Sequence, residues 1–169
     1  ARRRGLAVEF EAGLSGDFAE LVAESRFLLT TSITEGFGFS FLEPWTAGKF
    51  LWGRKLSDIC RDFEADGVYL DHLYTRLAVP LTWIEEDGFQ NRWTACFRQL
   101  CGRFHRPVSE SEVQRAWASI SADGTIDFGL LDESAQQTVI RSVLESNRFK
   151  QTLVECNPFL EYPGRLENR

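Results

Sequence analysis

The chain contains 169 residues, of which 43% are hydrophobic and 13% aromatic, and it carries a formal net charge of −6. Such a chain can bury a hydrophobic core and is expected to form one domain, or one domain with an appendage. The negative charge argues against a nucleic-acid partner, which requires a clustered basic surface. No apolar run approaches the about 18 residues of a membrane span, so no span is predicted.

The chain has four cysteines, Cys60, Cys96, Cys101 and Cys156, and no C-x-x-C pair. Zinc-ligand spacing is therefore absent, and no metal site is predicted. We interpret the thiols as reduced and mostly buried, as in a cytoplasmic protein. Because the sequence contains no methionine, not even at position 1, we expect it to be a piece of a longer protein.

The first part of the chain alternates predicted strands and helices. Residues 6–10 (LAVEF) are typical of a strand, and Asp17 can cap a following helix. Residues 26–32 predict a buried strand, residues 39–47 a helix and residues 49–53 the next strand. Strands and helices that alternate at these spacings predict βαβ units and a parallel sheet.

The second part is predicted to be helical. Apolar residues recur at helical spacing over residues 89–104, and Ser109 with Glu112 forms a capping-box pattern for the next helix. After a turn-rich break at residues 122–129, a further helix starts at Asp132. A last helix, over residues 148–156, stops at an Asn-Pro pair.

The stretch SITEGFGFSFLEPW, residues 32–45, places two acids around a glycine-rich turn. Glu35 follows a predicted parallel strand, and ligands of open α/β sheets bind beyond the carboxyl ends of the strands. Gly36 and Gly38 allow close approach to the backbone, and the N–H groups of the following helix favour a phosphate. Glu43 lies about one turn into that helix, where it could bind ribose hydroxyls. The pattern indicates a sugar-nucleotide site.

Each of these residues also has a purely structural interpretation. Ser40 and Glu43 match a capping box, in which Glu43 only accepts from a backbone N–H. An acid in a turn, such as Glu35, is commonly just solvated. Trp45 could stack on a base or belong to the core. Spacing alone does not decide between these alternatives.

The stretch TSITEGFGFSFLEPWTAGK resembles the signature of retaining glycosyltransferases that have two Rossmann-like halves, the GT-B fold. In that signature a strand runs into Glu-Gly-Phe-Gly, and a second Glu follows after seven residues at the head of a helix. Glu35 and Glu43 have this spacing. The resemblance covers about the first 70 to 80 residues, since residues 57–70 are similar to the segment that returns the chain to the sheet.

The resemblance implies a role for each residue of the motif. Glu35 would lie beside the donor hexose as the catalytic carboxylate, and Glu43 would bind the ribose of the donor nucleotide. The Gly36, Phe37 and Gly38 backbone would contact the sugar or the diphosphate. The implied reaction is displacement at the anomeric carbon with retention, with no metal required.

The turn after the next strand departs from the family pattern. The family commonly has Gly-Gly there, whereas this chain has Gly53, Arg54 and Lys55. The two cations could face a diphosphate or lie in a solvated loop. The Arg and Lys that the family uses on the diphosphate come from the first strand of the same half, and this sequence has no match for them.

The predicted fold class is therefore α/β. Residues 1–84 would form a partial Rossmann-like region, from the C-terminal half of a GT-B enzyme, and residues 85–169 a helical extension. The expected function is binding of a nucleoside-diphosphate sugar within a hexosyltransferase, with the fragment alone inactive. The expected partner is the missing N-terminal part of the same enzyme, which would cover the edge of the motif strand as a separate chain. The alternative is a non-catalytic nucleotide-sugar-binding or α/β interaction module.

Overall fold

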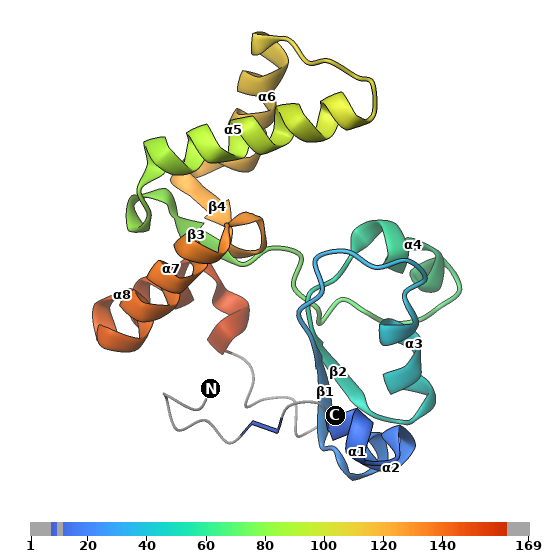
Figure 1. Ribbon diagram of the computed structural model, residues 1–169. Coiled ribbons are helices and arrows are strands. Elements are labelled where there is room, and N and C mark those ends of the chain that lie inside the picture. Colours follow the sequence, from blue (N-terminus) through green and yellow to red (C-terminus); the bar gives the residue numbers. More distant parts are fainter. Residues whose placement is uncertain (1–7, 10–11, 162–169) are drawn as a thin grey trace. The chain divides into compact units, whose positions relative to one another are not determined.

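The computed structural model describes residues 8–9 and 12–161 (Figure 1). The chain has an α/β fold and divides into two compact units, Ala1–Thr75 and Arg76–Arg169. The predicted boundary lies after residue 84 instead. Residues 76–84 belong to the second unit because they include a short strand and a 3-10 turn whose side chains Val79 and Leu81 enter its core.

The first unit contains a parallel pair of strands joined by a helix, as the sequence predicts. Strand β1 (Phe27–Thr30) pairs with β2 (Phe50–Gly53), and the pairing is extended by a parallel bridge between Arg54 and Tyr74. The helices of this unit are α1 (Ala12–Ser15), α2 (Phe18–Glu24), α3 (Phe39–Thr46) and α4 (Ser57–Ala65). The β1–α3–β2 segment is therefore the predicted βαβ unit.

One face of the β1–β2 pair is covered by α3 and α4. The core on this side contains Phe41 from α3 and Cys60 from α4, which are 1% and 0% exposed, together with Leu51 of β2. Residues after α4 close it, namely Val68, Leu70 and Leu73. Burial of these apolar side chains is the main stabilisation of the unit.

The opposite face of β1 is open, which corrects the prediction of a fully buried strand. Phe27 and Leu29 alternate away from the core and are 56% and 57% exposed. Within the described residues, the parallel sheet has only the strands β1 and β2, so a full Rossmann-like sheet is not present. The predicted strand at residues 6–10 falls largely outside the described residues, and Val8 and Glu9 lie in neither helix nor strand.

The second unit is mostly helical but also contains a two-stranded antiparallel sheet. The strands β3 (Ala78–Pro80) and β4 (Thr125–Asp127) pair with Val79 opposite Ile126, and both side chains are 0% exposed. The helices are α5 (Glu86–Arg103), α6 (Glu110–Ile120), α7 (Glu133–Glu145) and α8 (Asn147–Cys156), with short 3-10 turns at Leu81–Trp83, Ala122–Gly124, Phe128–Leu130 and Pro158–Glu161. The region predicted as purely helical therefore needs this correction, because β4 lies inside the predicted turn-rich break.

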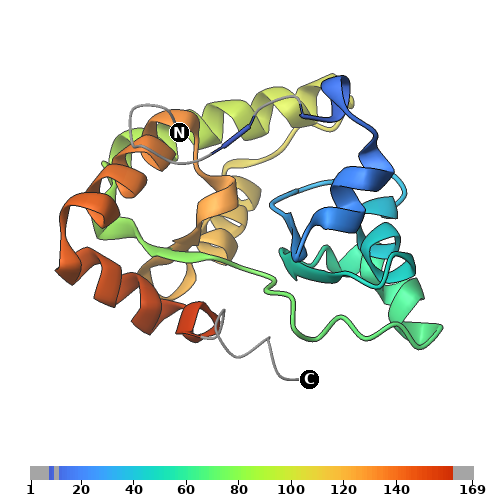
Figure 2. The same ribbon diagram turned by 90° about the horizontal axis from the view of Figure 1, so that it is seen from below.

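A buried amide joins the end of the second unit to its first strand. Asn157, 2% exposed, accepts from the Ala78 N–H at 2.7 Å and donates to the Ala78 and Leu153 carbonyls, each at 2.8 Å. Helices α7 and α8, which precede this residue, pack against each other (Figure 2). Asn157 thus satisfies both backbone groups of Ala78 from a position 79 residues along the chain.

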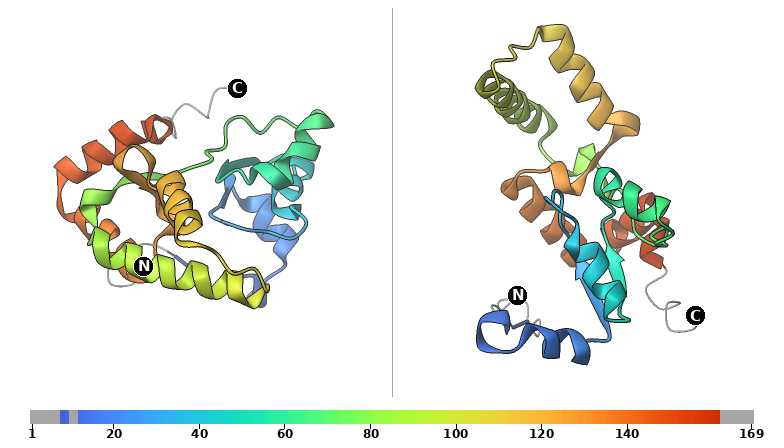
Figure 3. Two further views of the ribbon diagram at one scale, coloured as in Figure 1. Left: turned by 90° about the horizontal axis from the view of Figure 1, so that it is seen from above. Right: turned by 90° about the vertical axis from the view of Figure 1, so that its right-hand side faces the viewer.

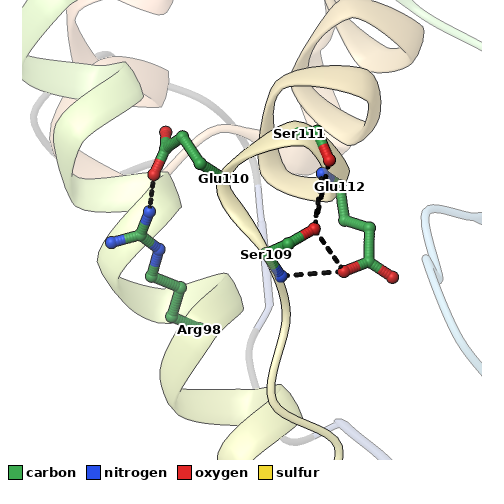
Figure 4. A network of polar contacts seen from close by, with 5 residues as sticks. All are labelled: Arg98, Ser109, Glu110, Ser111 and Glu112. Carbon is green, nitrogen blue, oxygen red and sulfur yellow. Dashed lines mark hydrogen bonds and ion pairs between the residues drawn. The ribbon is translucent and has the colours of Figure 1, made fainter.

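Two predicted helix starts in the second unit are confirmed. Ser109 and Glu112 form a reciprocal capping box, and the bonds to Ser109 lower the pKa of Glu112 (Figure 4). Asp132 accepts from the Ala135 N–H at 2.9 Å and from Arg92 at 2.8 Å, and these bonds lower its pKa. Side-chain capping is a local interaction, which is why the sequence pattern predicts it.

The four cysteines form no disulfide, but the prediction that most are buried is wrong. Cys60 is buried, Cys96 is exposed, and Cys101 and Cys156 are partly exposed. Among the residues described, no helix combines the length and the hydropathy needed to cross a membrane.

Candidate functional site

The candidate site lies at the carboxyl ends of β1 and β2. Thr30 and Gly53 are the last residues of the two strands and stand opposite each other in register. The loop with Glu35 leaves β1 at this edge, and Arg54 and Lys55 leave β2 at the same edge. The parallel pairing therefore brings the two predicted groups of site residues to one edge of the sheet, as expected from sequence.

Gly53 is required by the packing of this edge. Its φ is +137°, and a Cβ atom there would lie 1.9 Å from the Thr30 carbonyl oxygen. The Arg54 N–H donates to that same oxygen at 3.1 Å. Side chains cannot be accommodated at position 53 without separating the two strands.

Glu35 is held by the first turn of α3. The Ser40 hydroxyl donates to Glu35 Oε1 at 2.5 Å, and the Glu35 side chain is half-buried. Burial raises the pKa of the Cys60 thiol, and the negative charges of Glu64 and Glu35 raise it further. Its other oxygen, Oε2, accepts no hydrogen bond from the described residues. Glu35 is therefore a positioned carboxylate rather than a freely solvated one.

Glu43 does not cap α3, so the capping-box interpretation is wrong. The N-cap is Gly38, which makes no side-chain capping bond, and the Ser40 hydroxyl is directed to Glu35 instead. Glu43 is exposed on α3 and forms neither a hydrogen bond nor an ion pair through its side chain with the part of the chain that is described. Its carboxylate is available to a ligand.

The two glycines of the motif have different roles in the fold. Gly38 is buried with a φ of +72°, and a Cβ atom would lie 2.3 Å from Ile59 Cγ2 on α4. It is needed for the packing of α3 against α4. Gly36 is exposed, and a Cβ atom there would meet no atom within 4 Å. The fold has no requirement for glycine at position 36, and the backbone there is open to approach.

The N-terminus of α3 is bordered by exposed aromatic rings. Phe37 and Phe39 are 81% and 63% exposed, and their ring centroids lie 6.1 Å apart. Gly38 between them offers no side-chain acceptor, and the first N–H groups of a helix have no acceptor within the helix. Trp45 is 63% exposed, so of its two alternatives the structure contradicts burial in the core. It lies two residues after Glu43, about 200° around the helix.

Arg54 and Lys55 are both engaged with the protein. The Arg54 guanidinium is buried, donates to the Thr75 carbonyl at 3.1 Å and lies 5.6 Å from the centre of the Tyr74 ring. Lys55 donates to Glu64 at 2.5 Å, and this bond raises the Lys55 pKa. The solvated-loop interpretation is therefore wrong, because Arg54 holds the chain that follows α4 and Lys55 is bonded to Glu64 on α4.

A cavity of about 270 Å³ lies beside the partners of Lys55. It is lined by Glu64 and by residues 67–71, including Asp71, whose carboxylate is 3.8 Å from Lys55 Nζ. Its two carboxylates make it unsuited to a phosphate. Sequence reasoning missed this arrangement and the Ser40–Glu35 bond, since neither pair has a spacing that marks it as a contact.

Comparisons with protein-family models, curated proteins and solved structures find no match to this chain. No group of three or more His, Cys, Asp or Glu residues that could hold a metal occurs within residues 8–9 and 12–161.

Proposed function

We propose that the first unit is the nucleotide-sugar-binding part of a retaining glycosyltransferase, which transfers a hexose from a nucleoside-diphosphate sugar. The observation that supports this proposal is that, among the described residues, α3 has polar groups without partners at its N-terminus and at Glu43. Its N-terminus has no side-chain cap, and Glu43 on the same helix has no partner among the described residues. A free helix N-terminus suits a phosphate, and a free carboxylate one turn later suits ribose hydroxyls.

In this proposal the diphosphate occupies the N-terminus of α3. The N–H groups of Phe39 and Ser40 face it, and the open backbone at Gly36 and Phe37 borders the sugar. The helix dipole stabilises the negative charge that develops on the departing nucleoside diphosphate. Glu35 lies beside the hexose, oriented by its bond from Ser40 at 2.5 Å.

Arg54 and Lys55 have a more restricted part in the proposal. A diphosphate would bind Lys55 only by replacing Glu64, which now accepts its hydrogen bond at 2.5 Å. Arg54 is buried and holds the Thr75 carbonyl, so it orders the edge of the site. The cations that balance the diphosphate would then come mainly from another part of the protein, and no metal or cofactor is assigned.

The same proposal includes a partner for β1. Parallel sheets are normally covered on both faces, and a strand with an unpaired edge favours pairing with another strand. Among the described residues β1 pairs only with β2, which leaves its other edge without a strand partner, and Phe27 and Leu29 are exposed on one of its faces. We propose that the remaining strands of the enzyme, elsewhere in the protein or in a separate chain, pair with β1, and that the unit by itself does not turn over substrate.

The test is isothermal titration of the complete protein with UDP, GDP and ADP. One of them is expected to bind, and Glu43→Ala should weaken its binding by about 1–3 kcal/mol through loss of charge-assisted hydrogen bonds. Glu20→Ala, at an exposed acid on α2, is the matched control and should leave affinity unchanged. Equal affinities for the Glu43 variant and the unaltered protein would remove Glu43 from the site.

Turnover separates catalysis from binding. Glu35→Gln should bind the nucleoside diphosphate nearly as well and lose hexose transfer, because Glu35 is assigned to the sugar and not to the nucleotide. Binding without any transfer by the unaltered complete protein would favour the second candidate, a non-catalytic nucleotide-sugar-binding module.

A further inference from the structure

The apolar face of α5 continues beyond the core of the second unit. Phe89 near its start is 2% exposed, Phe97 is half-buried, and Leu100 and Phe104 are 52% and 76% exposed. These positions follow helical spacing, so they share one face. We call the exposed end of this face, Leu100 with Arg103–Arg106, the α5 tip; it leads into the turn before α6 (Figures 1 and 3).

The α5 tip is basic in an acidic chain. No Asp or Glu occurs over residues 88–109, although the net charge of the chain is −6. In this range, Arg92 is ion-paired with Asp132 at the N-cap of α7, and Arg98 is ion-paired with Glu110 of α6. The side chains of Arg103 and Arg106 form no hydrogen bond or ion pair with the described part of the chain.

The acids nearest to the tip are already occupied. Arg98 pairs with Glu110, and Glu112 accepts from both the backbone N–H and the hydroxyl of Ser109 at 2.7 Å (Figure 4). Arg103 and Arg106 thus form no ion pair with these acids, although the Glu112 charge attracts Arg106 through space, and both arginines lie beside the exposed Leu100 and Phe104.

The turn that carries these side chains has a fixed conformation. The His105 N–H donates to the Gly102 carbonyl at 3.0 Å, and the Arg106 N–H donates to the Cys101 carbonyl at 3.0 Å. This is the Schellman pattern, which normally has glycine where His105 adopts a φ of +54°. The hydrogen bonds hold Phe104 and the two arginines at the end of the helix rather than in an irregular loop.

We propose that the α5 tip binds the surface of an anionic lipid bilayer. Leu100 and Phe104 insert into the interface between headgroups and acyl chains, and Arg103 and Arg106 contact lipid phosphates. A bilayer is favoured over an acidic protein because a phenyl ring that is 76% exposed at a helix end can enter lipid without a complementary groove. The proposal concerns peripheral binding only, and it is independent of the proposed glycosyltransferase function.

The test is co-sedimentation of the full 169-residue chain with two kinds of vesicle, pure phosphatidylcholine and phosphatidylcholine mixed with phosphatidylglycerol. The chain should bind the mixed vesicles at least about tenfold more tightly, because each arginine near the surface adds to the attraction. Leu100→Ser/Arg103→Ser should lower that affinity by about tenfold or more. Phe104→Ser, which keeps both arginines, should also lower it.

The matched control is Leu144→Ser/Arg148→Ser, which removes an exposed leucine and arginine from α7 and α8. Binding through the exposed apolar residues of the first unit would be the same in the tip variants and in this control variant, so the comparison also detects that case. Circular dichroism verifies that each variant is folded. Equal binding to both vesicles, or equal binding by the tip and control variants, would overturn the proposal. So would binding of polyglutamate by the tip with no binding to the mixed vesicles.

Discussion

The two units of this protein each contain a pair of strands, but only one pair is enclosed. Strands β3 and β4 are antiparallel, and their central residues Val79 and Ile126 are 0% exposed. Strands β1 and β2 are parallel, and Phe27 and Leu29 of β1 are more than half exposed. The second unit therefore encloses its strands in its own core, whereas the first leaves apolar side chains of β1 exposed, and under the proposed function another element covers them.

The largest expected effect comes from separating the units after Thr75. Residues 76–169 should fold cooperatively as a monomer, because their strands and helices enclose a common core. Residues 1–75 should aggregate or fail to give a cooperative thermal transition, because β1 lacks a cover. Circular dichroism melting and size-exclusion chromatography with light scattering provide the measurement. A monomeric, cooperatively melting first unit would contradict the comparison and weaken the proposed function.

The next effect tests the closure of the second unit. Asn157→Ala should lower the free energy of unfolding by about 3 kcal/mol, because it leaves the part-buried N–H and carbonyl of Ala78 without the partners that Asn157 provides. Chemical denaturation of the full chain measures it. Asn91→Ala, at an exposed position on α5, should change stability by less than about 0.5 kcal/mol. Similar values for the two variants would show that the amide does not close this unit.

Substitutions at two glycines of the first unit should distinguish an effect on stability from an effect on ligand binding. Gly53→Ala should destabilise the full chain by at least about 2 kcal/mol, since the added Cβ would lie 1.9 Å from the Thr30 carbonyl oxygen. Gly36→Ala should change stability by less than about 1 kcal/mol, because it meets no atom within 4 Å. Under the proposed function it should nonetheless weaken binding of the nucleoside-diphosphate sugar, as titration calorimetry would detect. Unchanged affinity for the nucleotide sugar would mean that Gly36 is not part of the site.

The smallest expected effect is on the pH dependence of stability, which differs between the two units. The Asp132 pKa is lowered by its bonds from Ala135 and Arg92, so its stabilisation is present above the unfolded value of about 3.9 and is lost as pH falls through the folded pKa. The Lys55 pKa is raised by Glu64, so its stabilisation is full below about 10.4 and is lost as pH rises through the folded pKa. Each contribution is expected to be about 1 kcal/mol or less.

Melting temperatures measured across pH would show the loss of stability at low pH and the loss at high pH. Asp132→Asn should remove the loss at low pH, and Lys55→Met should remove the loss at high pH. Glu133→Gln and Lys150→Met, at exposed positions, are the controls and should leave the loss of stability at low pH and at high pH unchanged. If the melting temperature of Asp132→Asn still falls at low pH as it does in the unaltered protein, other carboxylates cause the acid sensitivity.

Local sequence determined many of the helices and the βαβ succession of this protein, together with several helix ends. The capping pair Ser109–Glu112, the N-cap Asp132 and the βαβ succession from β1 to β2 all follow from interactions within a few residues or from apolar periodicity. The edge that gathers Glu35 with Arg54 follows as well, because parallel strands end on the same side.

Tertiary structure alone decided which side chains are free to act. Ser40 bonds Glu35 and leaves Glu43 unengaged, while Lys55 is taken by Glu64. The strand β4 forms because it meets β3, 45 or more residues upstream, and a three-residue strand has no periodicity of its own to detect. Exposure of Phe27 and Leu29 is likewise invisible in sequence, because an apolar run is the same whether or not a neighbour is present to bury it.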